Sequence, residues 1–153
     1  MAETKVVIFK LNNELCSVEA SLVFKIEKYS EVSLIPQMPD YIKGLYDLRG
    51  RVVPVVDLNK KFGMGDSEIT KKTKIIITEN EGQLFGFMVN NVIEIINLQE
   101  DLIDKSEAIL RVNNKQYIKG VGRKDDKLFS IIDLNEVLHE AEVQEVAEVI
   151  SNK

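Results

Sequence analysis

Few side chains in this sequence could carry acid–base or nucleophilic chemistry. The single histidine, His139, has no cysteine or second histidine beside it that would complete a metal site. The single cysteine, Cys16, lies in an apolar stretch, where we expect a small core residue, and it cannot form an internal disulfide. Asp57 and Asp133 could form a carboxylate pair, but each precedes Leu-Asn after an apolar run, which is typical of a capping residue. We therefore expect no catalytic residue, no metal site and no cofactor.

The charge distribution argues against a nucleic-acid partner. The net charge is −5, and residues 136–153 contribute −4 of it through five glutamates against one lysine. The basic clusters at 60–61 and 71–74 are too short for the stripe that phosphate binding requires. No apolar run reaches the ~20 residues of a membrane helix, and residues 1–5 lack the apolar core of a signal peptide. We expect a cytoplasmic protein with no direct membrane insertion.

Two segments of the chain repeat with the same offset between their copies. The Tyr-Ile-Lys-Gly sequence of residues 41–44 returns at 117–120, and the Asp-Leu-Asn sequence of 57–59 returns at 133–135. We call the offset from Tyr41 to Tyr117 the long spacing. Because both repeated sequences have the long spacing, residues 41–59 align with residues 117–135 without a gap.

Upstream of these segments the repeat continues with a smaller offset. We call the offset from Ile26 to Ile95 the short spacing, and it also relates Leu15 to Leu84 and Val18 to Phe87. A repeat of this kind indicates one structural unit used twice. The approximate halves would be residues 1–66 and 67–135, with possible strand exchange between them.

The hydrophobic pattern predicts short strands over most of residues 1–135. Alternating or β-branched runs separated by turn sequences are typical of a sandwich or small barrels rather than a βαβ sheet. Each half would hold about five strands, a common number for a small barrel. The predicted strands cover residues 6–11, 15–18, 22–26, 51–58, 74–78, 84–89, 92–96, 108–112 and 127–134.

The C-terminal segment, residues 136–153, is predicted to be an amphipathic helix. Asp133 and Glu136 resemble a capping box with aspartate in the usual serine position. Val143, Val146 and Ile150 then recur at helical spacing. A helix that packs back on a barrel is favoured over a helix that binds a partner.

Some features occur only in the first copy of the repeat, and a specialised function is expected there. They are the sequence Asp-Leu-Arg-Gly at residues 47–50 and the proline at 54. Because Pro54 has no N–H, it favours a sheet edge or a bulge. Gly44 and Gly50, with Gly120 in the second copy, are expected where the backbone needs a positive φ or a close approach.

Residues 35–58 resemble the signature of the CheW family. Its usual form is I-P-x-x-P-x-[YF]-I-x-G-[VI]-x-N-L-R-G-x-[IV]-x-P-[IV]-[IV]-D-L, and the chain follows it from Ile35 to Leu58. Residues 23–26 resemble the V-x-E-I sequence that precedes the signature, and residues 117–120 and 128–134 resemble the closing strands of the family. The likeness covers roughly residues 5 to 140.

This resemblance implies both a fold and a function. The fold would be a single domain over residues 1–153, all-β, with two five-stranded SH3-like barrels related by an approximate two-fold axis. The function would be that of a non-enzymatic adaptor that couples methyl-accepting chemotaxis receptors to the regulatory domain of the histidine kinase CheA. Such an adaptor is cytoplasmic and is recruited to membrane-associated receptor arrays.

The resemblance also implies a receptor-binding surface in the first half of the chain. Lys25 replaces the usual glutamate of V-x-E-I, with Glu27 two residues further on, and Asp47 replaces the usual asparagine. Arg49 either recognises a partner through its guanidinium or bonds carbonyls within its own turn. The candidate receptor-binding residues are Val23, Lys25, Ile26, Glu27, Asp47, Leu48 and Arg49.

Two alternative functions remain open at the level of the sequence. A small-ligand β-barrel would need a cavity lined by convergent polar groups, whereas the expected interior positions are aliphatic. An unrecognised enzyme would need a cluster of ionisable groups in a cleft, and Asp57 and Asp133 are the candidates for it.

Overall fold

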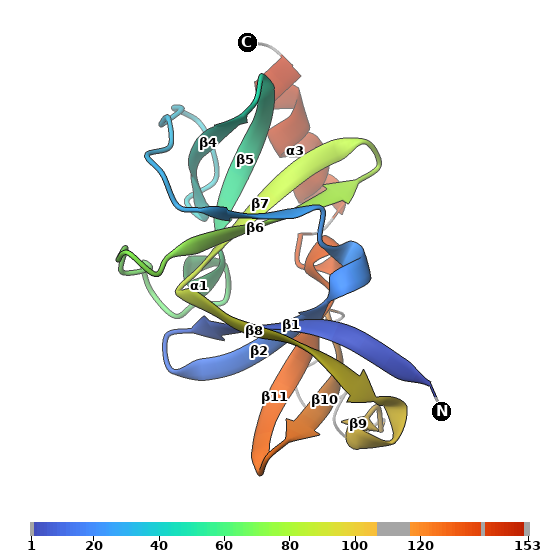
Figure 1. Ribbon diagram of the computed structural model, residues 1–153. Helices are drawn as coiled ribbons and strands as arrows, with labels where there is room; N and C mark the ends of the chain where they lie inside the picture. The colour runs from blue at the N-terminus through green and yellow to red at the C-terminus, as the bar shows by residue number, and fades with distance from the viewer. Residues whose placement is uncertain (1, 107–116, 139, 152–153) are drawn as a thin grey trace.

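Two β-sheets, each curled into a half-barrel, make up most of the protein in the computed structural model, which describes residues 2–106, 117–138 and 140–151 (Figure 1). We call them the terminal sheet, with strand order β8-β1-β2-β11-β10-β9, and the central sheet, with order β3-β6-β7-β5-β4. The terminal sheet contains β1 (Glu3–Leu11), β2 (Glu14–Glu19), β8 (Asn91–Gln99), β9 (Ile103–Asp104), β10 (Ile118–Lys124) and β11 (Lys127–Ile132). The central sheet contains β3 (Lys25–Lys28), β4 (Ile42–Leu48), β5 (Arg51–Asp57), β6 (Lys74–Asn80) and β7 (Gln83–Val89). The predicted all-β fold is confirmed.

The two sheets do not follow the chain halves 1–66 and 67–135. In the central sheet, β3 from the first half pairs with β6 from the second, with Ile26 opposite Ile76. In the terminal sheet, β8 from the second half pairs with β1 from the first, with Ile95 opposite Val7. The short spacing relates Ile26 to Ile95 and also relates Val7 to Ile76. Each half of the chain therefore contributes its first hairpin to one sheet and its remaining strands to the other.

Apolar side chains fill three cores. One lies between the two sheets and contains residues of both, among them Phe9, Phe87 and Leu134. A second core, around Ile75 and Ile77, belongs to the central sheet alone. The third is formed by terminal-sheet residues such as Val6, Leu98 and Phe129. The shared core holds the two sheets as one body, because neither sheet can expose these side chains without losing their burial free energy.

The repeated motif has the same geometry in both copies. The Asp57 amide donates to the carbonyl of Tyr41 at 2.7 Å, and the Asp133 amide donates to the carbonyl of Tyr117 at 2.8 Å. Both hairpins carry a register irregularity next to the motif glycine, Gly44 in one and Gly120 in the other. These glycines permit close packing, since a Cβ on Gly44 would lie 2.7 Å from the Ser33 carbonyl oxygen.

Pro54 occupies an interior strand and not a sheet edge, the first of the two positions predicted for it, and the register irregularity of its hairpin lies on β4, between Ile42 and Gly44. Strand β5 lies between β7 and β4, and Pro54 faces Leu45 of β4. Leu45 directs its own N–H and carbonyl to Ser33, so Pro54 needs no N–H on the β4 side. On the other side the pairing with β7 begins only at Val55. The missing donor therefore leaves no ladder bond unmade.

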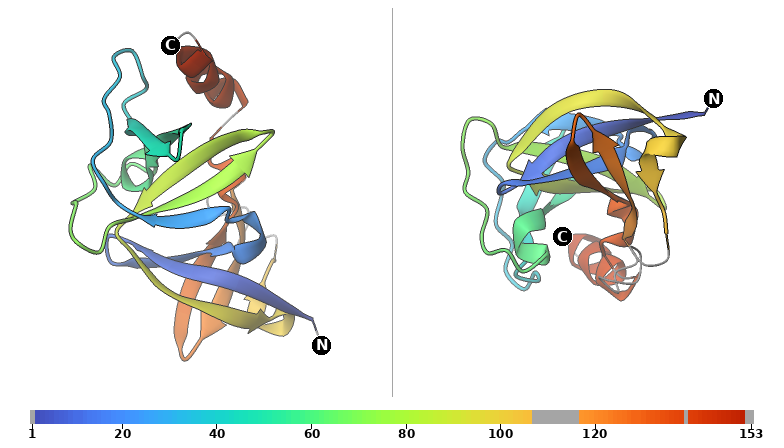
Figure 2. Two further views of the ribbon diagram at one scale, coloured as in Figure 1. Left: turned by 45° about the horizontal axis from the view of Figure 1, so that its top comes forward. Right: turned by 90° about the horizontal axis from the view of Figure 1, so that it is seen from below.

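Short helical segments connect the strands, and one longer helix ends the chain (Figure 2). The connectors are η1 (Ala20–Leu22), α1 (Leu58–Lys61), η2 (Glu100–Leu102) and η3 (Leu134–Glu136). Helix α3 covers Glu140–Ser151, so it begins after the predicted residue 136. Asp133 caps η3 instead, accepting a bond from the Asn135 amide at 3.0 Å. His139 and the predicted strand at 108–112 lie outside the described residues.

Candidate functional site

Strand β3 and the segment just before it carry four of the predicted receptor-binding residues, at the edge of the central sheet. Lys25 Nζ lies 3.5 Å from Glu27 Oε1, so the cation that replaces the family glutamate pairs with the next acidic residue on its face. Val23 and Ile26 are half-buried against the shared core. The side chains of Lys25 and Glu27 are thus accessible to solvent, whereas those of Val23 and Ile26 contribute to packing.

The β4–β5 hairpin places the Asp-Leu-Arg-Gly sequence at its tip. Arg49 and Gly50 have φ values of 49° and 91°, the positive pair that defines a type I′ turn. The Gly50 amide donates to Asp47 Oδ1 at 2.8 Å, so Asp47 stabilises the turn. Leu48 is 6% exposed and belongs to the central-sheet core. Leu48 is therefore a core residue.

Arg49 is exposed at this tip. Within the described part of the chain its guanidinium makes no hydrogen bond or ion pair, either with Asp47 or with the carbonyls of the turn. The alternative that Arg49 bonds carbonyls within its own turn is therefore wrong for the described residues, and the turn is held instead by the Gly50 amide bond to Asp47. No hydrogen bond or ion pair among the described residues joins this tip to Lys25 or Glu27.

A neighbouring arginine links the hairpin to the beginning of β3. The Arg51 guanidinium lies 5.8 Å from the centre of the Phe24 ring, within the range of a cation–π contact. Its Nη2 is also 3.9 Å from Glu79 Oε2. Phe24 itself is 51% exposed. The sequence prediction did not include Phe24 or Arg51, although Phe24 lies between two residues that it did include.

Strand β8 presents a matching apolar edge on the terminal sheet. Ile93 and Ile95 are 41% and 57% exposed, and the short spacing relates them to Phe24 and Ile26. Strands β3 and β8 are end strands of their sheets, and both lie at the front in Figure 1. We call the exposed apolar residues Phe24, Ile93 and Ile95 the edge surface. The short spacing is the signal in the sequence that identifies its β8 members.

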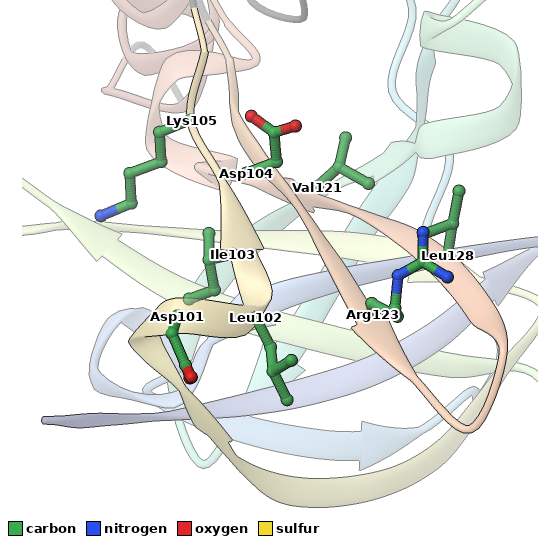
Figure 3. Close-up of a pocket in the computed structure, with 8 residues that line it drawn as sticks. All are labelled: Asp101, Leu102, Ile103, Asp104, Lys105, Val121, Arg123 and Leu128. Carbon is green, nitrogen blue, oxygen red and sulfur yellow. The ribbon is translucent and has the colours of Figure 1, made fainter. Parts of the chain in front are cut away.

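A second candidate surface lies at the opposite edge of the terminal sheet, beside the short strand β9 (Figure 3). It is a pocket of about 480 Å³, with the apolar Leu102 and Leu128 at its margin. Charged residues of both signs line the pocket around these side chains, namely Asp101, Asp104, Lys105 and Arg123 (Figure 3). An apolar centre with a charged rim suits contact with another protein.

Asp57 and Asp133 cap separate turns and do not form a pair with each other. Asp57 is buried, and its carboxylate accepts bonds from the Ser67 hydroxyl and, at 3.0 Å, the Ser67 amide. Asp133 accepts from Asn135. Burial raises the pKa of the Cys16 thiol, which keeps it protonated and unreactive. The described residues contain no group of three or more His, Cys, Asp and Glu side chains arranged to hold a metal ion.

The fold and these surfaces define a class of protein, a two-sheet β-protein that exposes apolar side chains at its sheet edges and a pocket lined by both signs of charge. The CheW-like domain family matches the chain over residues 5–142. The chain belongs to the CheW family.

Its relatives are similar over most of their length. The chemotaxis protein CheW of Bacillus subtilis is 30% identical over 134 residues, 88% of this chain and 86% of that protein. The chemotaxis protein CheW of Helicobacter pylori is 28% identical, over 85% and 78% of the two chains. The crystal structure of the scaffolding protein TtCheW from Thermoanaerobacter tengcongensis matches with a TM-score of 0.78 and 32% identity, covering 91% of this chain and 90% of that one. Among the described residues, no helix is long and apolar enough to span a membrane.

Proposed function

We propose that this protein is a non-enzymatic adaptor that couples chemotaxis receptors to the regulatory domain of the histidine kinase CheA. The observation that carries the proposal is membership of the CheW family over residues 5–142. It is supported by the two separate candidate surfaces, since an adaptor needs to bind two partners at once. The protein would work in the cytoplasm, at receptor arrays on the membrane.

The edge surface suits the cytoplasmic tip of a receptor, which is a helical hairpin. An amphipathic helix can place its apolar face on Phe24, Ile93 and Ile95, which are exposed at the end strands of the two sheets. Lys25, Glu27 and Arg49 would then supply polar contacts around this apolar centre. Arg49 would carry the most specific contact, because a guanidinium pairs with a carboxylate through two parallel hydrogen bonds.

The pocket beside β9 suits the kinase. The regulatory domain of CheA is expected to share this fold, so an edge-to-edge contact between two similar sheets would bury Leu102 and Leu128. Asp101, Asp104, Lys105 and Arg123 offer both signs of charge for the rim of such a contact. The two partners would then lie on different edges of the molecule and would not compete.

The test measures the phosphorylation rate of the cognate CheA with receptor cytoplasmic fragments, with and without this protein. We expect a receptor-dependent rise in the phosphorylation rate. Arg49→Ala should reduce this rise about tenfold, because one charge-assisted contact is lost. Asp125→Ala is the matched control, because the long spacing relates Asp125, at the tip of the β10–β11 hairpin, to Arg49. Wild-type protein that binds neither receptor nor kinase would overturn the proposal.

A further inference from the structure

The end of the central sheet is covered by helix α3. Val146 is 0% exposed and packs in the shared core together with Tyr41 and Val56. Lys61 Nζ contacts Glu142 Oε2 at 2.8 Å and lies 4.6 Å from the centre of the Tyr41 ring. Burial, with the Glu142 carboxylate second, raises the pKa of the Tyr41 hydroxyl. In Figure 1, α3 lies behind the ends of β5 and β7.

At the counterpart end of the terminal sheet, no helix of the described residues lies in the equivalent place. There a pocket of about 470 Å³ lies beside β2 and β11, the strands that correspond to β7 and β5 in the repeat. Tyr117 and Ile132 line it, and the long spacing relates them to Tyr41 and Val56, which α3 covers. No described helix occupies this pocket. The main apolar lining residues are Leu15, Phe62, Met64, Tyr117, Ile118 and Ile132.

The linker after β5 forms one wall of the pocket. Phe62 stacks on Tyr117 with ring centres 4.8 Å apart and planes 12° from parallel. Met64 follows on the same linker, and its amide is fixed by a bond of 2.8 Å to the Asn59 carbonyl. The wall is therefore a formed surface, held by a ring stack and a backbone bond.

We propose that this pocket binds an amphipathic helix of a partner protein, with a lysine or arginine beside its apolar stripe. A helix is inferred because the equivalent end of the other sheet is covered by one, through apolar side chains and an ion pair. A basic residue is inferred because Glu14 is the one charged side chain among the described residues that line the pocket. Helix α3 of a second copy fits poorly, since its glutamates would face Glu14. The pocket shares Val121 and Leu128 with the pocket beside β9, but the variants below change neither residue, so the test does not depend on the kinase contact.

The probe is a labelled peptide of about 14 residues, with leucines at the i, i+3, i+4 and i+7 positions and lysines elsewhere. A second peptide has glutamate in place of every lysine. We expect fluorescence anisotropy to show binding of the lysine peptide and at least about tenfold weaker binding of the glutamate peptide. Backbone amide shifts should change at Leu15, Ile118 and their neighbours. Glu14→Lys should reverse the preference between the two peptides.

The matched pair of variants is Met64→Glu and Ile69→Glu. Both residues lie on the linker between α1 and β6 and both changes add one negative charge, but only Met64 lines the pocket. We expect Met64→Glu to weaken the lysine peptide about tenfold, as for loss of a buried apolar side chain, and Ile69→Glu to leave its affinity unchanged. Melting curves check that both variants fold. Equal effects of the two variants, no binding of the lysine peptide, or shift changes confined to β3 and β8 would overturn the proposal.

Discussion

The two hairpin tips of the repeat make the same turn from different residues. At the β4–β5 tip Arg49 and Gly50 have φ values of 49° and 91°, and at the β10–β11 tip Asp125 and Asp126 have 49° and 66°. Aspartate tolerates a positive φ better than arginine does. Because the second copy makes the turn without an arginine, the turn itself does not require Arg49. In line with the proposed function, we expect Arg49 to be present for a contact that its guanidinium makes with a partner.

Substitution of the motif glycines should give the largest difference between the two copies in the free energy of unfolding. A Cβ on Gly44 would lie 2.7 Å from the Ser33 carbonyl oxygen, and two bonds with Leu45 hold Ser33 in place. A Cβ on Gly120 would lie 3.0 Å from the Asp104 carbonyl oxygen, on the short edge strand β9, which can shift. We expect Gly44→Ala to lower the free energy of unfolding by about 3 kcal/mol and Gly120→Ala by about 1 kcal/mol. Urea denaturation measures both, and equal losses would contradict this asymmetry.

Substitution of the capping aspartates should give the next largest difference in the free energy of unfolding. Asp57 is buried and accepts bonds from Ser67 and from the Lys60 amide, whereas Asp133 is partly exposed and accepts from Asn135. Removing the Asp57 carboxylate would leave buried donors without a partner. We expect Asp57→Ala to cost about 2 kcal/mol and Asp133→Ala about 1 kcal/mol of unfolding free energy. Thermal melts of the two variants test the order, which a larger loss in Asp133→Ala would refute.

Much of this architecture could be predicted from the sequence, because the repeated residues are ones whose types are limited by packing in the fold. The long spacing corresponds to two equivalent hairpin bases, and the short spacing to the equivalent pairings of Ile26 and Ile95. The strand exchange could not be located, because a repeat shows which segments are equivalent but not which sheet each one joins. Strand β4 was also missed, since Gly44 interrupts its alternating pattern.

The accessibility of the candidate residues could be predicted from the sequence only in part. Lys25, Glu27 and Arg49 are accessible, while Leu48 is a core residue because its side chain points to the inner face of the sheet near the tip. Sequence order alone does not show which face of a short hairpin is buried. Phe24 and Ile93 were missed, because an exposed apolar residue in a strand looks like a core residue until the sheet edges are known.

Substitutions of the residues that flank the two tips should differ less in their effect on the free energy of unfolding. Asp47 accepts the Gly50 amide bond of 2.8 Å, and Arg123 holds the equivalent position in the second hairpin. This bond is exposed, so its net contribution is modest. We expect Asp47→Ala to cost about 1 kcal/mol and Arg123→Ala to leave stability unchanged. Chemical denaturation of the two variants, side by side, shows whether the first tip depends on its aspartate.

The smallest expected effect is also the most informative about the tip. Arg49→Asn keeps a polar residue but replaces arginine with one that adopts a positive φ more readily. We expect it to raise the free energy of unfolding by about 0.5 kcal/mol, while it reduces receptor-dependent kinase activation as Arg49→Ala does. Asp125→Asn in the second tip, where the residue is already tolerant, should change neither quantity. A stabilised Arg49→Asn variant with reduced coupling would mean that arginine is kept at a conformational cost for binding. A destabilised variant with normal coupling would instead mean that Arg49 serves the turn, and the difference between the two tips would lose its functional meaning.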